Sequence, residues 1–291
     1  MAWQIARNGD FEELITFLNI VEWGHVAFSS RLLVKGKKNF PSGSQAKIYI
    51  NVVDNRQPKI AEAILVSSTG LVVPVLARSG DEGKEREDIV GIFANSKLGP
   101  AMPKVHSIMG IKRNVLELER CLHRQAYAAL NYHLMTLDKL PANGADGALT
   151  YECRKGRLKD TSLLYPLQKA YEIEEVLINP SNFNSRLCYL HLQKALKNEM
   201  VYFIVEKGSA VAKAGSNAQG FSYIQIGGVY TVETKRNEGY GAEVLKFLIS
   251  KIIKKGKKAC LFVKKDNSPA IQLYTKVGFS IRDAFRISYF H

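Results

Sequence analysis

Hydrophobic positions in this chain repeat with two different periods, which predict strands and helices in alternation. Short apolar or alternating runs, such as 48–52 and 71–77, are typical of strands. Apolar residues three and four positions apart, as in 242–253, are typical of helices. Strands are expected at 48–52, 60–67, 71–77, 132–137, 149–154, 200–206, 210–214, 224–232 and 259–263. Helices are expected at 10–18, 89–93 and 114–122, after Asp160, at 183–197, at 242–253 and around Tyr274.

The clearest break in the chain lies at 141–147, where Pro, Asn, Asp and Gly residues separate two strand-like runs. Both halves share one order: helix, helix, hairpin of apolar strands, third strand, helix, strand. This repetition predicts an α/β chain made of two lobes, 1–140 and 145–291, a length that suits two ordinary domains.

A glycine-containing turn lies between the strand 224–232 and the helix 242–253. Residues 236–241 read Arg-Asn-Glu-Gly-Tyr-Gly, and Gly239 and Gly241 let the backbone approach an anion without a Cβ in the way. The start of the helix adds unpaired N–H groups and about half a positive charge. This predicts an anion site, although an ordinary turn before a helix produces the same G-x-G.

Two familiar phosphate-binding motifs do not fit this turn. A P-loop requires G-x-x-x-x-G-K-[ST], which the sequence lacks. A dinucleotide-binding G-x-G-x-x-G requires a third glycine at the start of its domain, whereas this turn lies late in its half. In the first half we match the turn to 109–114, which contains one glycine, and we expect the first lobe to have lost phosphate binding.

The residues after the turn make the pattern more specific. They keep the spacing N-x-x-A-x-x-x-Y-x-x-x-G-F, as Asn267, Ala270, Tyr274, Gly278 and Phe279. With the turn, which fits Q/R-x-x-G-x-G/A, and the Gly-Gly-Val-Tyr-Thr strand before it, the second half resembles the GNAT-type N-acetyltransferases. The first half resembles a degenerate copy, as in tandem members of that family. The resemblance implies a mixed, largely antiparallel sheet flanked by helices, in two tandem lobes.

The resemblance also implies a cofactor, acetyl-coenzyme A, and a set of residues that bind it. Backbone amides of the turn would hold the pyrophosphate, the strand edge would pair with the pantetheine, and Asn267 would bond to the cofactor between the strands. The implied set is Val229, Tyr230, Thr231, Arg236, Asn237, Glu238, Gly239, Tyr240, Gly241, Ala242 and Asn267.

Direct transfer of an acetyl group to an amine needs a general acid and a general base, and no metal. The resemblance implies that Tyr274 protonates the leaving thiolate, a sensible role for a phenol of pKa near 10. A core aromatic on a short amphipathic helix is the alternative for this residue. Two carboxylates are candidates for the base: Glu175, which clusters with Glu172 and Glu174, and Glu233, which follows the central strand. Each is also an ordinary surface or capping carboxylate by position.

Composition and charge narrow the class of protein further. The formal net charge of +14 suits a polyanionic partner, and a phosphorylated cofactor uses part of it. The four cysteines form no C-x-x-C pair, which favours unpaired thiols in a reducing compartment. Apolar runs are far shorter than the roughly 18 to 20 residues of a membrane helix, and the start carries no secretory pattern. We therefore expect a cytoplasmic protein without a membrane partner.

Three functional classes remain open. The first is an acetyltransferase for an amine acceptor, which the motif spacing favours. The second is a non-catalytic module that binds acyl-CoA as a regulatory ligand. The third, suggested by the charge, is a nucleic-acid-binding protein, which ranks last because no basic helix-turn-helix or aromatic-basic motif is present. The identity of the amine and the oligomeric state do not follow from the sequence.

Overall fold

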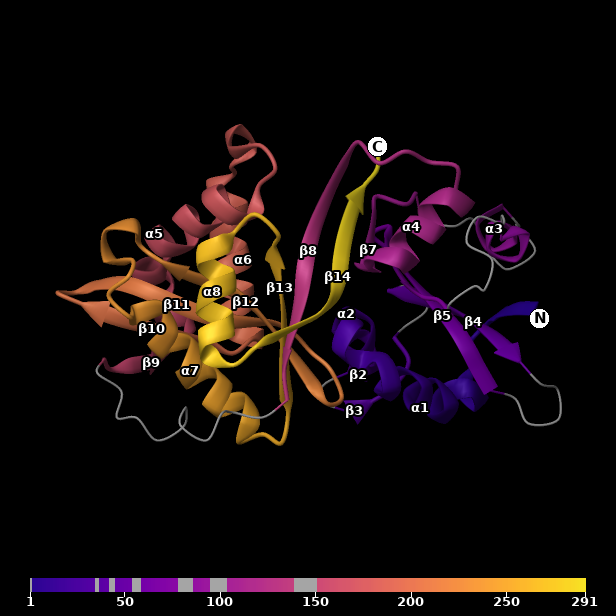
Figure 1. Ribbon diagram of the computed structural model, residues 1–291, viewed down its shortest axis with the longest axis horizontal. Helices are drawn as coiled ribbons and strands as arrows, with labels where there is room; N and C mark the ends of the chain where they lie inside the picture. Colours follow the sequence, from indigo (N-terminus) through magenta and orange to yellow (C-terminus); the bar gives the residue numbers. More distant parts are fainter. Residues whose placement is uncertain are drawn as a thin grey trace. The chain divides into compact units, whose positions relative to one another are not determined.

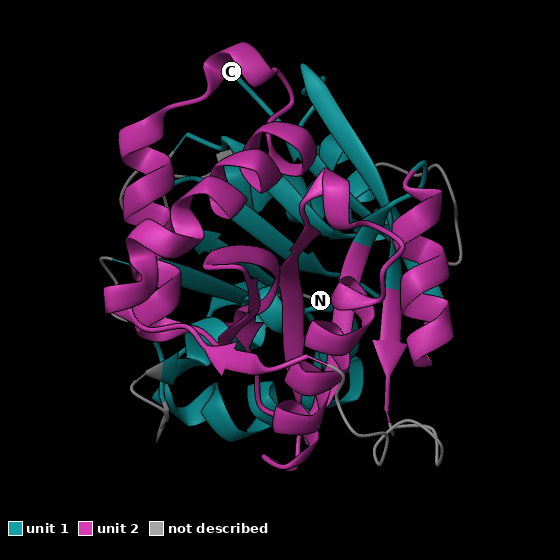
Figure 2. Cartoon of the chain, turned by 90° about the vertical axis from the view of Figure 1, so that its left-hand side faces the viewer, with its two compact units in different colours: residues 1–134, 263–266, 282–291 teal, residues 135–262, 267–281 magenta. Residues whose placement is uncertain are grey.

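The computed structural model (Figure 1) describes residues 2–34, 37–41, 45–53, 59–77, 86–94, 104–138 and 151–291. The chain forms two compact units (Figure 2). The first unit consists of Met1–Leu134, Val263–Asp266 and Arg282–His291, and the second unit consists of Met135–Phe262 and Asn267–Ile281. The predicted break at 141–147 lies outside the described residues.

Strands that lie wholly or mostly in the first unit are hydrogen-bonded in the order β1-β4-β5-β6-β7-β14-β8. Its strands are β1 (Ala2–Ile5), β4 (Ala46–Val53), β5 (Lys59–Ser67), β6 (Leu71–Val75), β7 (Ser107–Ile111), β8 (Ala128–Leu137) and β14 (Ser280–Tyr289). Its helices are α1 (Phe11–Val21), α2 (Val26–Ser29), α3 (Glu87–Ala94) and α4 (Lys112–Cys121), and β2 (Leu33–Val34) pairs with β3 (Lys37–Lys38). Strands β6 and β7 are parallel, and α3 connects them.

The second unit contains strands in the order β13-β12-β11-β10-β9. These are β9 (Cys153–Lys155), β10 (Val201–Glu206), β11 (Ser209–Gln219), β12 (Tyr223–Thr231) and β13 (Lys258–Lys264). The helices are α5 (Thr161–Tyr171), α6 (Ser185–Asn198), α7 (Tyr240–Ile253) and α8 (Ser268–Val277). Strands β12 and β13 are parallel, whereas the pairs β9–β10, β10–β11 and β11–β12 are antiparallel. The predicted fold class, a mixed and largely antiparallel sheet flanked by helices, is confirmed.

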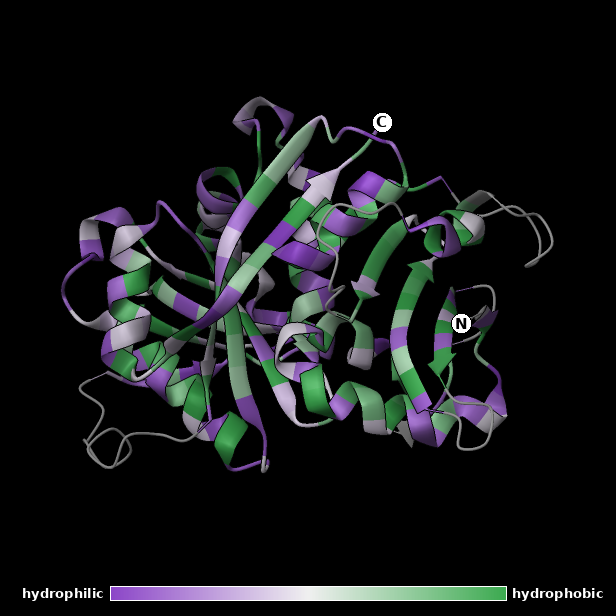
Figure 3. Cartoon of the chain, turned by 45° about the vertical axis from the view of Figure 1, so that its right-hand side comes forward, coloured by the Kyte–Doolittle hydropathy of each residue, from purple (hydrophilic) through white to green (hydrophobic). Residues whose placement is uncertain are grey.

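Local sequence explains the elements that frame the end of β12. Helix α7 buries one apolar stripe completely: Val244, Leu245, Leu248, Ile249 and Ile252. Helix α8 begins where the Asn267 side chain accepts a hydrogen bond from the N–H of Ala270, and it ends at Gly278 with φ +109°. Figure 3 shows long hydrophobic stretches along the strands and mixed hydrophobic and polar faces on the helices.

The two faces of the second unit's sheet are covered by different helices. On one face, Tyr202 of β10 packs edge-on against Phe247 of α7, with ring centroids 5.1 Å apart. Lys213 of β11 is opposite Phe203, the neighbour of Tyr202, and therefore lies on the other face, because neighbouring strand residues alternate between faces. There its ammonium contacts the ring of Tyr171 of α5. The core between α5, α6 and the sheet contains Leu164, Leu167, Leu192, Leu196, Val201, Phe203 and Tyr230.

One sequence comparison between the halves is wrong. We matched 109–114 to the glycine turn, but these residues end β7 and begin α4. The helix that joins the parallel strands is α3 in the first unit and α7 in the second, so 109–114 corresponds instead to the start of α8. Without knowledge of which strands pair in parallel, a strand followed by a helix could be matched to either position.

The compact units also divide the chain differently from a single cut between two lobes. Residues 263–266 and 282–291 group with the first unit although they follow the second along the sequence. Strand β14 accounts for the second of these segments, because its residues from Phe285 to Tyr289 pair with β7. The lobes 1–140 and 145–291 remain a prediction about functional domains. No helix among the described residues is long and apolar enough to cross a membrane.

Candidate functional site

The parallel strands at the centre of the second unit separate before either one ends. Pairing runs from Tyr223 opposite Lys258 to Ile226 opposite Leu261. Strand β12 then continues to Thr231 without further described pairing to β13. Residues 227–231 therefore carry backbone groups on the β13 side that the sheet does not use, and an extended ligand could pair with them.

A β-bulge lies in this separated part of β12. Lys213 of β11 is opposite Tyr230, and Gly215 is opposite Gly227, so two residues of β12 face one residue of β11. Gly228, the first of the two, has φ +62°, a conformation that favours glycine. The bulge turns the next peptide group, between Gly228 and Val229, out of the regular ladder.

The glycine turn leads into an exposed helix start. Gly239, with φ +91°, is the N-cap of α7, and the space where its Cβ would stand is open. The first hydrogen bond of the helix runs from the N–H of Glu243 to the carbonyl of Gly239 (3.1 Å). The N–H groups of Tyr240, Gly241 and Ala242 precede it and have no acceptor inside the helix. They are the donors that the predicted anion site requires.

Gly241 allows this helix start to approach the end of β12. A Cβ at Gly241 would lie 3.0 Å from the side-chain oxygen of Thr231 and 3.7 Å from a Leu273 methyl group of α8. The approach to Thr231 is tight enough that a Cβ would force a shift there, whereas the distance to Leu273 is an ordinary contact. The glycine therefore keeps the amides of the helix start next to the edge of β12.

A carboxylate from the turn after α5 holds two predicted cofactor-binding side chains. Glu174 accepts hydrogen bonds from the guanidinium of Arg236 (2.7 and 2.8 Å) and from the phenol of Tyr230 (2.7 Å). The side chain of Arg236 also donates to the carbonyl of Thr231 (3.3 Å). These contacts tie the glycine turn to the π-helical turn Glu172–Val176.

The tyrosine of the glycine turn points into the protein. Tyr240 is 2% exposed, its ring stacks on Tyr151 at 4.0 Å between centroids, and its hydroxyl donates to Glu206 (2.8 Å). Lys235 pairs with the same carboxylate (2.8 Å). The side chain of Tyr240 is therefore engaged elsewhere, and its contribution to the predicted anion site would be its backbone N–H.

The structure brings three of the predicted site residues together. Tyr274 of α8 is 8% exposed, and burial, with smaller contributions from Tyr171 and Glu175, raises its pKa well above the ordinary value. Asn267 donates a hydrogen bond to Glu175 (3.1 Å) while its carbonyl oxygen caps α8. The amide of Asn267 thus joins the start of α8 to the π-helical turn, and it holds one oxygen of the Glu175 carboxylate.

The second candidate for the base lies in a different place. Glu233 begins the 3-10 turn Glu233–Lys235 that follows β12, and its backbone carbonyl accepts the N–H of Arg236 (3.2 Å). No described contact joins its carboxylate to Asn267 or Tyr274. Among the described residues, no group of His, Cys, Asp and Glu side chains is arranged to hold a metal ion.

Two residues that we did not predict lie beside the bulge. The phenol of Tyr171 interacts with the backbone of Gly228, and burial raises its pKa to about 12. Lys213 is 5% exposed, and its Nζ donates to the carbonyl of Gly228 (2.9 Å) and lies 4.3 Å from the centre of the Tyr171 ring. A sequence signal did exist for Lys213, because a lysine interrupts the otherwise apolar run 210–214.

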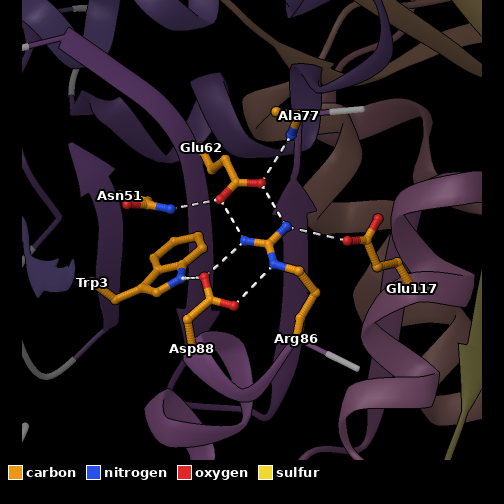
Figure 4. A network of polar contacts seen from close by, with 7 residues as sticks. All are labelled: Trp3, Asn51, Glu62, Ala77, Arg86, Asp88 and Glu117. Carbon is orange, nitrogen blue, oxygen red and sulfur yellow. Dashed lines mark hydrogen bonds and ion pairs between the residues drawn. The ribbon is translucent and has the colours of Figure 1, made fainter. Parts of the chain in front are cut away.

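The first unit has a different arrangement at the start of its own crossover helix (Figure 4). Arg86, directly before α3, donates to Glu62 (2.7 and 3.0 Å), to Asp88 (2.8 and 2.9 Å) and to Glu117 (3.2 Å). Glu62 also accepts the backbone N–H of Ala77, which follows β6 (3.1 Å). A carboxylate of the protein itself therefore bonds to the backbone after β6 in this unit.

Comparisons with known proteins agree with this geometry. Residues 204–287 match the family of FR47-like proteins. No curated protein matches the chain by sequence. Among solved structures, a Drosophila protein is similar, with TM-score 0.65 and 12% identity, over 99% of this chain and 98% of that one.

Two further solved structures cover the whole chain. An acetyltransferase of the GNAT family from Colwellia psychrerythraea has TM-score 0.55 and 12% identity, with 100% of both chains covered. A tandem GNAT protein from the clavulanic acid biosynthesis pathway has TM-score 0.55 and 10% identity, over 99% of this chain and 98% of that one. The resemblance to GNAT proteins, including a tandem arrangement, is confirmed, and at these identities the structures show the fold.

Proposed function

We propose that the second unit is an acetyl-CoA-dependent N-acetyltransferase that transfers the acetyl group directly to an amine. One observation carries the proposal: the unpaired edge of β12, the open start of α7 and the group of Tyr274, Glu175 and Asn267 all lie where β12 and β13 separate. An extended, phosphorylated thioester fits these three features together, whereas each feature alone has an ordinary structural explanation.

The residues of the turn fit a coenzyme A pyrophosphate. The N–H groups of Tyr240, Gly241 and Ala242 supply donors at the positive end of α7, and the missing Cβ of Gly239 leaves room for the anion. The edge of 229–231 offers backbone groups for the pantetheine amides. When bound, acetyl-CoA supplies an electrophilic thioester carbonyl. Asn237 and Glu238 complete the turn through their backbone.

Two side chains handle the protons of the proposed reaction. The amine must be neutral to attack, and the Glu175 carboxylate, oriented by Asn267, takes its proton directly or through water. The phenol of Tyr274 is neutral throughout the physiological pH range and gives a proton to the sulfur. As the carbon–sulfur bond breaks, the sulfur takes the phenol proton and the negative charge moves to the Tyr274 phenolate, which burial disfavours. The phenolate then regains a proton from water or from the Glu175 carboxyl, which has taken one from the amine.

This assignment is tested with Tyr274→Phe and with Tyr202→Phe as the control, a buried tyrosine whose ring packs against Phe247 of α7. We expect kcat to fall by about 10²- to 10⁴-fold for Tyr274→Phe only, with unchanged acetyl-CoA affinity. Thiol release from acetyl-CoA is followed with a panel of small amines and a lysine-containing peptide, and affinity is measured by calorimetry. Acetyl-CoA binding without thiol release in the wild type would instead support a regulatory acyl-CoA-binding module.

The choice of base is tested in the same assay with Glu175→Gln beside Glu233→Gln. Both substitutions remove one carboxylate and keep the side-chain shape. A loss confined to Glu175→Gln, largest below the pKa of the amine, supports Glu175 as the base. A loss confined to Glu233→Gln assigns the base to the turn after β12 instead.

A further inference from the structure

Lys213 is an unusual residue at the centre of the second unit. It lies in β11 opposite Tyr230, in the middle of the sheet, and only 5% of it is exposed. A buried lysine costs free energy unless its ammonium is well paired, and a methionine would fill the same space without that cost. Neither acetyl transfer nor coenzyme A binding as described above uses its side chain.

The surroundings of the Lys213 ammonium come from four elements. Strand β12 contributes the carbonyl of Gly228, and α5 contributes the face of the Tyr171 ring. The π-helical turn contributes Glu172, one carboxylate oxygen of which has no hydrogen-bond partner among the described residues, and α6 contributes Cys188. Cys188 is fully buried, and its pKa is raised to about 12, so it faces the lysine as a neutral thiol.

The position of the ammonium is tied to the bulge. The amine nitrogen lies 2.9 Å from the Gly228 oxygen and 3.0 Å from the place where a Cβ of Gly228 would stand. A peptide group is planar, and the carbonyl of Gly228 and the N–H of Val229 belong to the same plane and point in opposite directions. Lys213 therefore fixes the direction of the Val229 N–H through the carbonyl that it binds.

We propose that Lys213 is a positioning residue that aims and polarises the Val229 N–H toward the carbonyl oxygen of the bound acyl group. The inference rests on the proposed function. A cation bound to the carbonyl side of a peptide draws electron density from it, and its N–H becomes a stronger donor. Such a donor stabilises the negative charge that develops on the acyl oxygen during transfer.

The protonation state of Lys213 gives this role a signature. Burial lowers the pKa of the ammonium to about 7, and Glu172 opposes that shift in part. The cationic form therefore dominates below pH 7 and is lost as the pH rises through 7. The increase in kcat that Lys213 gives should fall with pH in parallel with the fraction of ammonium.

The experiment compares Lys213→Met, Lys213→Gln and the exposed Lys197→Met as control, all in the full chain. Binding of acetyl-CoA and of free CoA is measured by calorimetry, which needs no turnover. Wild type and Lys197→Met should prefer acetyl-CoA over CoA, and Lys213→Met should lose that preference while it keeps its affinity for CoA. An unchanged preference in Lys213→Met overturns the proposal, whether or not the protein turns acetyl-CoA over.

Kinetics supply the second measurement, with the thiol-release assay from pH 5.5 to 9. We expect kcat for Lys213→Met to be about 10- to 100-fold below wild type at pH 6, less than removing an oxyanion donor outright, and the ratio to shrink above pH 7. Lys213→Gln keeps a donor without the charge and should recover part of kcat, with a ratio to wild type that also shrinks above pH 7. A deficit that is equal at pH 6 and pH 9 in both variants contradicts the role of the charge.

Discussion

Each unit of this chain contains one pair of parallel strands joined by a crossover helix, and the two crossovers are built for opposite purposes. In the second unit, α7 begins with three N–H groups that have no acceptor among the described residues, next to glycines. In the first unit, the corresponding helix α3 begins beside Arg86, which is surrounded by Glu62, Asp88 and Glu117. The protein's own side chains gather at the start of the first crossover helix, whereas we propose that a ligand binds at the start of the second.

Charge and backbone both support this difference. Three carboxylates around one guanidinium leave an excess of negative charge, which repels a phosphate at the start of α3. Strand β6 pairs regularly with β5 from Val72 to Val75, without the bulge that β12 has, and Pro74 has no N–H to offer a ligand. The comparison teaches that a shared topology provides a helix start at the same place, and that local residues decide whether a ligand can use it.

The largest effect that sharpens this comparison is expected for Arg86→Met. Removal of the guanidinium leaves the Glu62 carboxylate, which is 4% exposed, without its counter-charge, and we expect the free energy of unfolding to fall by about 3–5 kcal/mol. Both tryptophans, Trp3 and Trp23, lie in the first unit, so their fluorescence during denaturation reports on that unit. Acetyl-CoA affinity should stay unchanged.

A double variant serves as the control for this prediction. Glu62→Gln together with Arg86→Met removes the uncompensated charge and should recover part of the lost stability. If Arg86→Met unfolds like the wild type, the cluster is only a surface ion network. If it abolishes acetyl-CoA binding while the protein stays folded, the first crossover takes part in ligand binding, and the contrast between the units fails.

The sequence predicted those parts of the second crossover that depend on neighbours along the chain. The helix 242–253 and its glycine turn follow from spacing, because each is set by residues within a few positions. The cluster around Arg86 joins Glu62, Asp88 and Glu117, which are far apart in sequence, and no local pattern announces it. The mistaken match of 109–114 has the same cause.

The residues of the candidate site divide in the same way. Tyr274 and Asn267 follow from their spacing, although the contact of Asn267 with Glu175 depends on how the turn after α5 packs against α8. Lys213 reaches Gly228 because of the register between β11 and β12, including a bulge that the sequence does not specify. A lysine within an apolar strand was the available signal, and its meaning required the partner strand.

A smaller effect, of opposite sign, is expected for the buried charge of the second unit. The pKa of Lys213 is about 7 in the folded protein and near 10.5 when unfolded, so between these values the unfolded chain binds more protons and stability rises with pH. Below pH 7 the folded protein carries the whole free-energy cost of burying the charged ammonium. Lys213→Met removes this cost but also loses the hydrogen bond to Gly228. The net result should be a variant about 1–3 kcal/mol more stable than wild type at pH 6, and the gain should shrink by pH 9.

Chemical denaturation followed by circular dichroism at both pH values measures this, with Lys197→Met as the control for loss of a lysine. If Lys213→Met is more stable than wild type yet slower in acetyl transfer, Lys213 serves function and not the stability of the fold. If Lys213→Met is less stable than wild type at both pH values, the ammonium stabilises the fold, in the same way as Arg86 in the first unit. The contrast between the two buried cations would then disappear.

The smallest effect concerns the glycine that keeps the second crossover open. Gly239 has φ +91° and Gly208, in the β10–β11 hairpin, has φ +81°, and neither has an atom within 4 Å of where a Cβ would stand. Alanine at either position costs about 1–2 kcal/mol of backbone strain without a clash. The two substitutions are therefore matched in the folded protein, and only Gly239 lies at the proposed anion site.

Gly239→Ala should weaken acetyl-CoA binding by about 5- to 30-fold, as that strain is relieved by a shift of the helix start, whereas Gly208→Ala should bind like the wild type. Calorimetric titration with acetyl-CoA and with the dephosphorylated pantetheine thioester measures both, and the loss should appear with acetyl-CoA only. Equal losses for the two alanine variants would show that the start of α7 is as closed to anions as the start of α3.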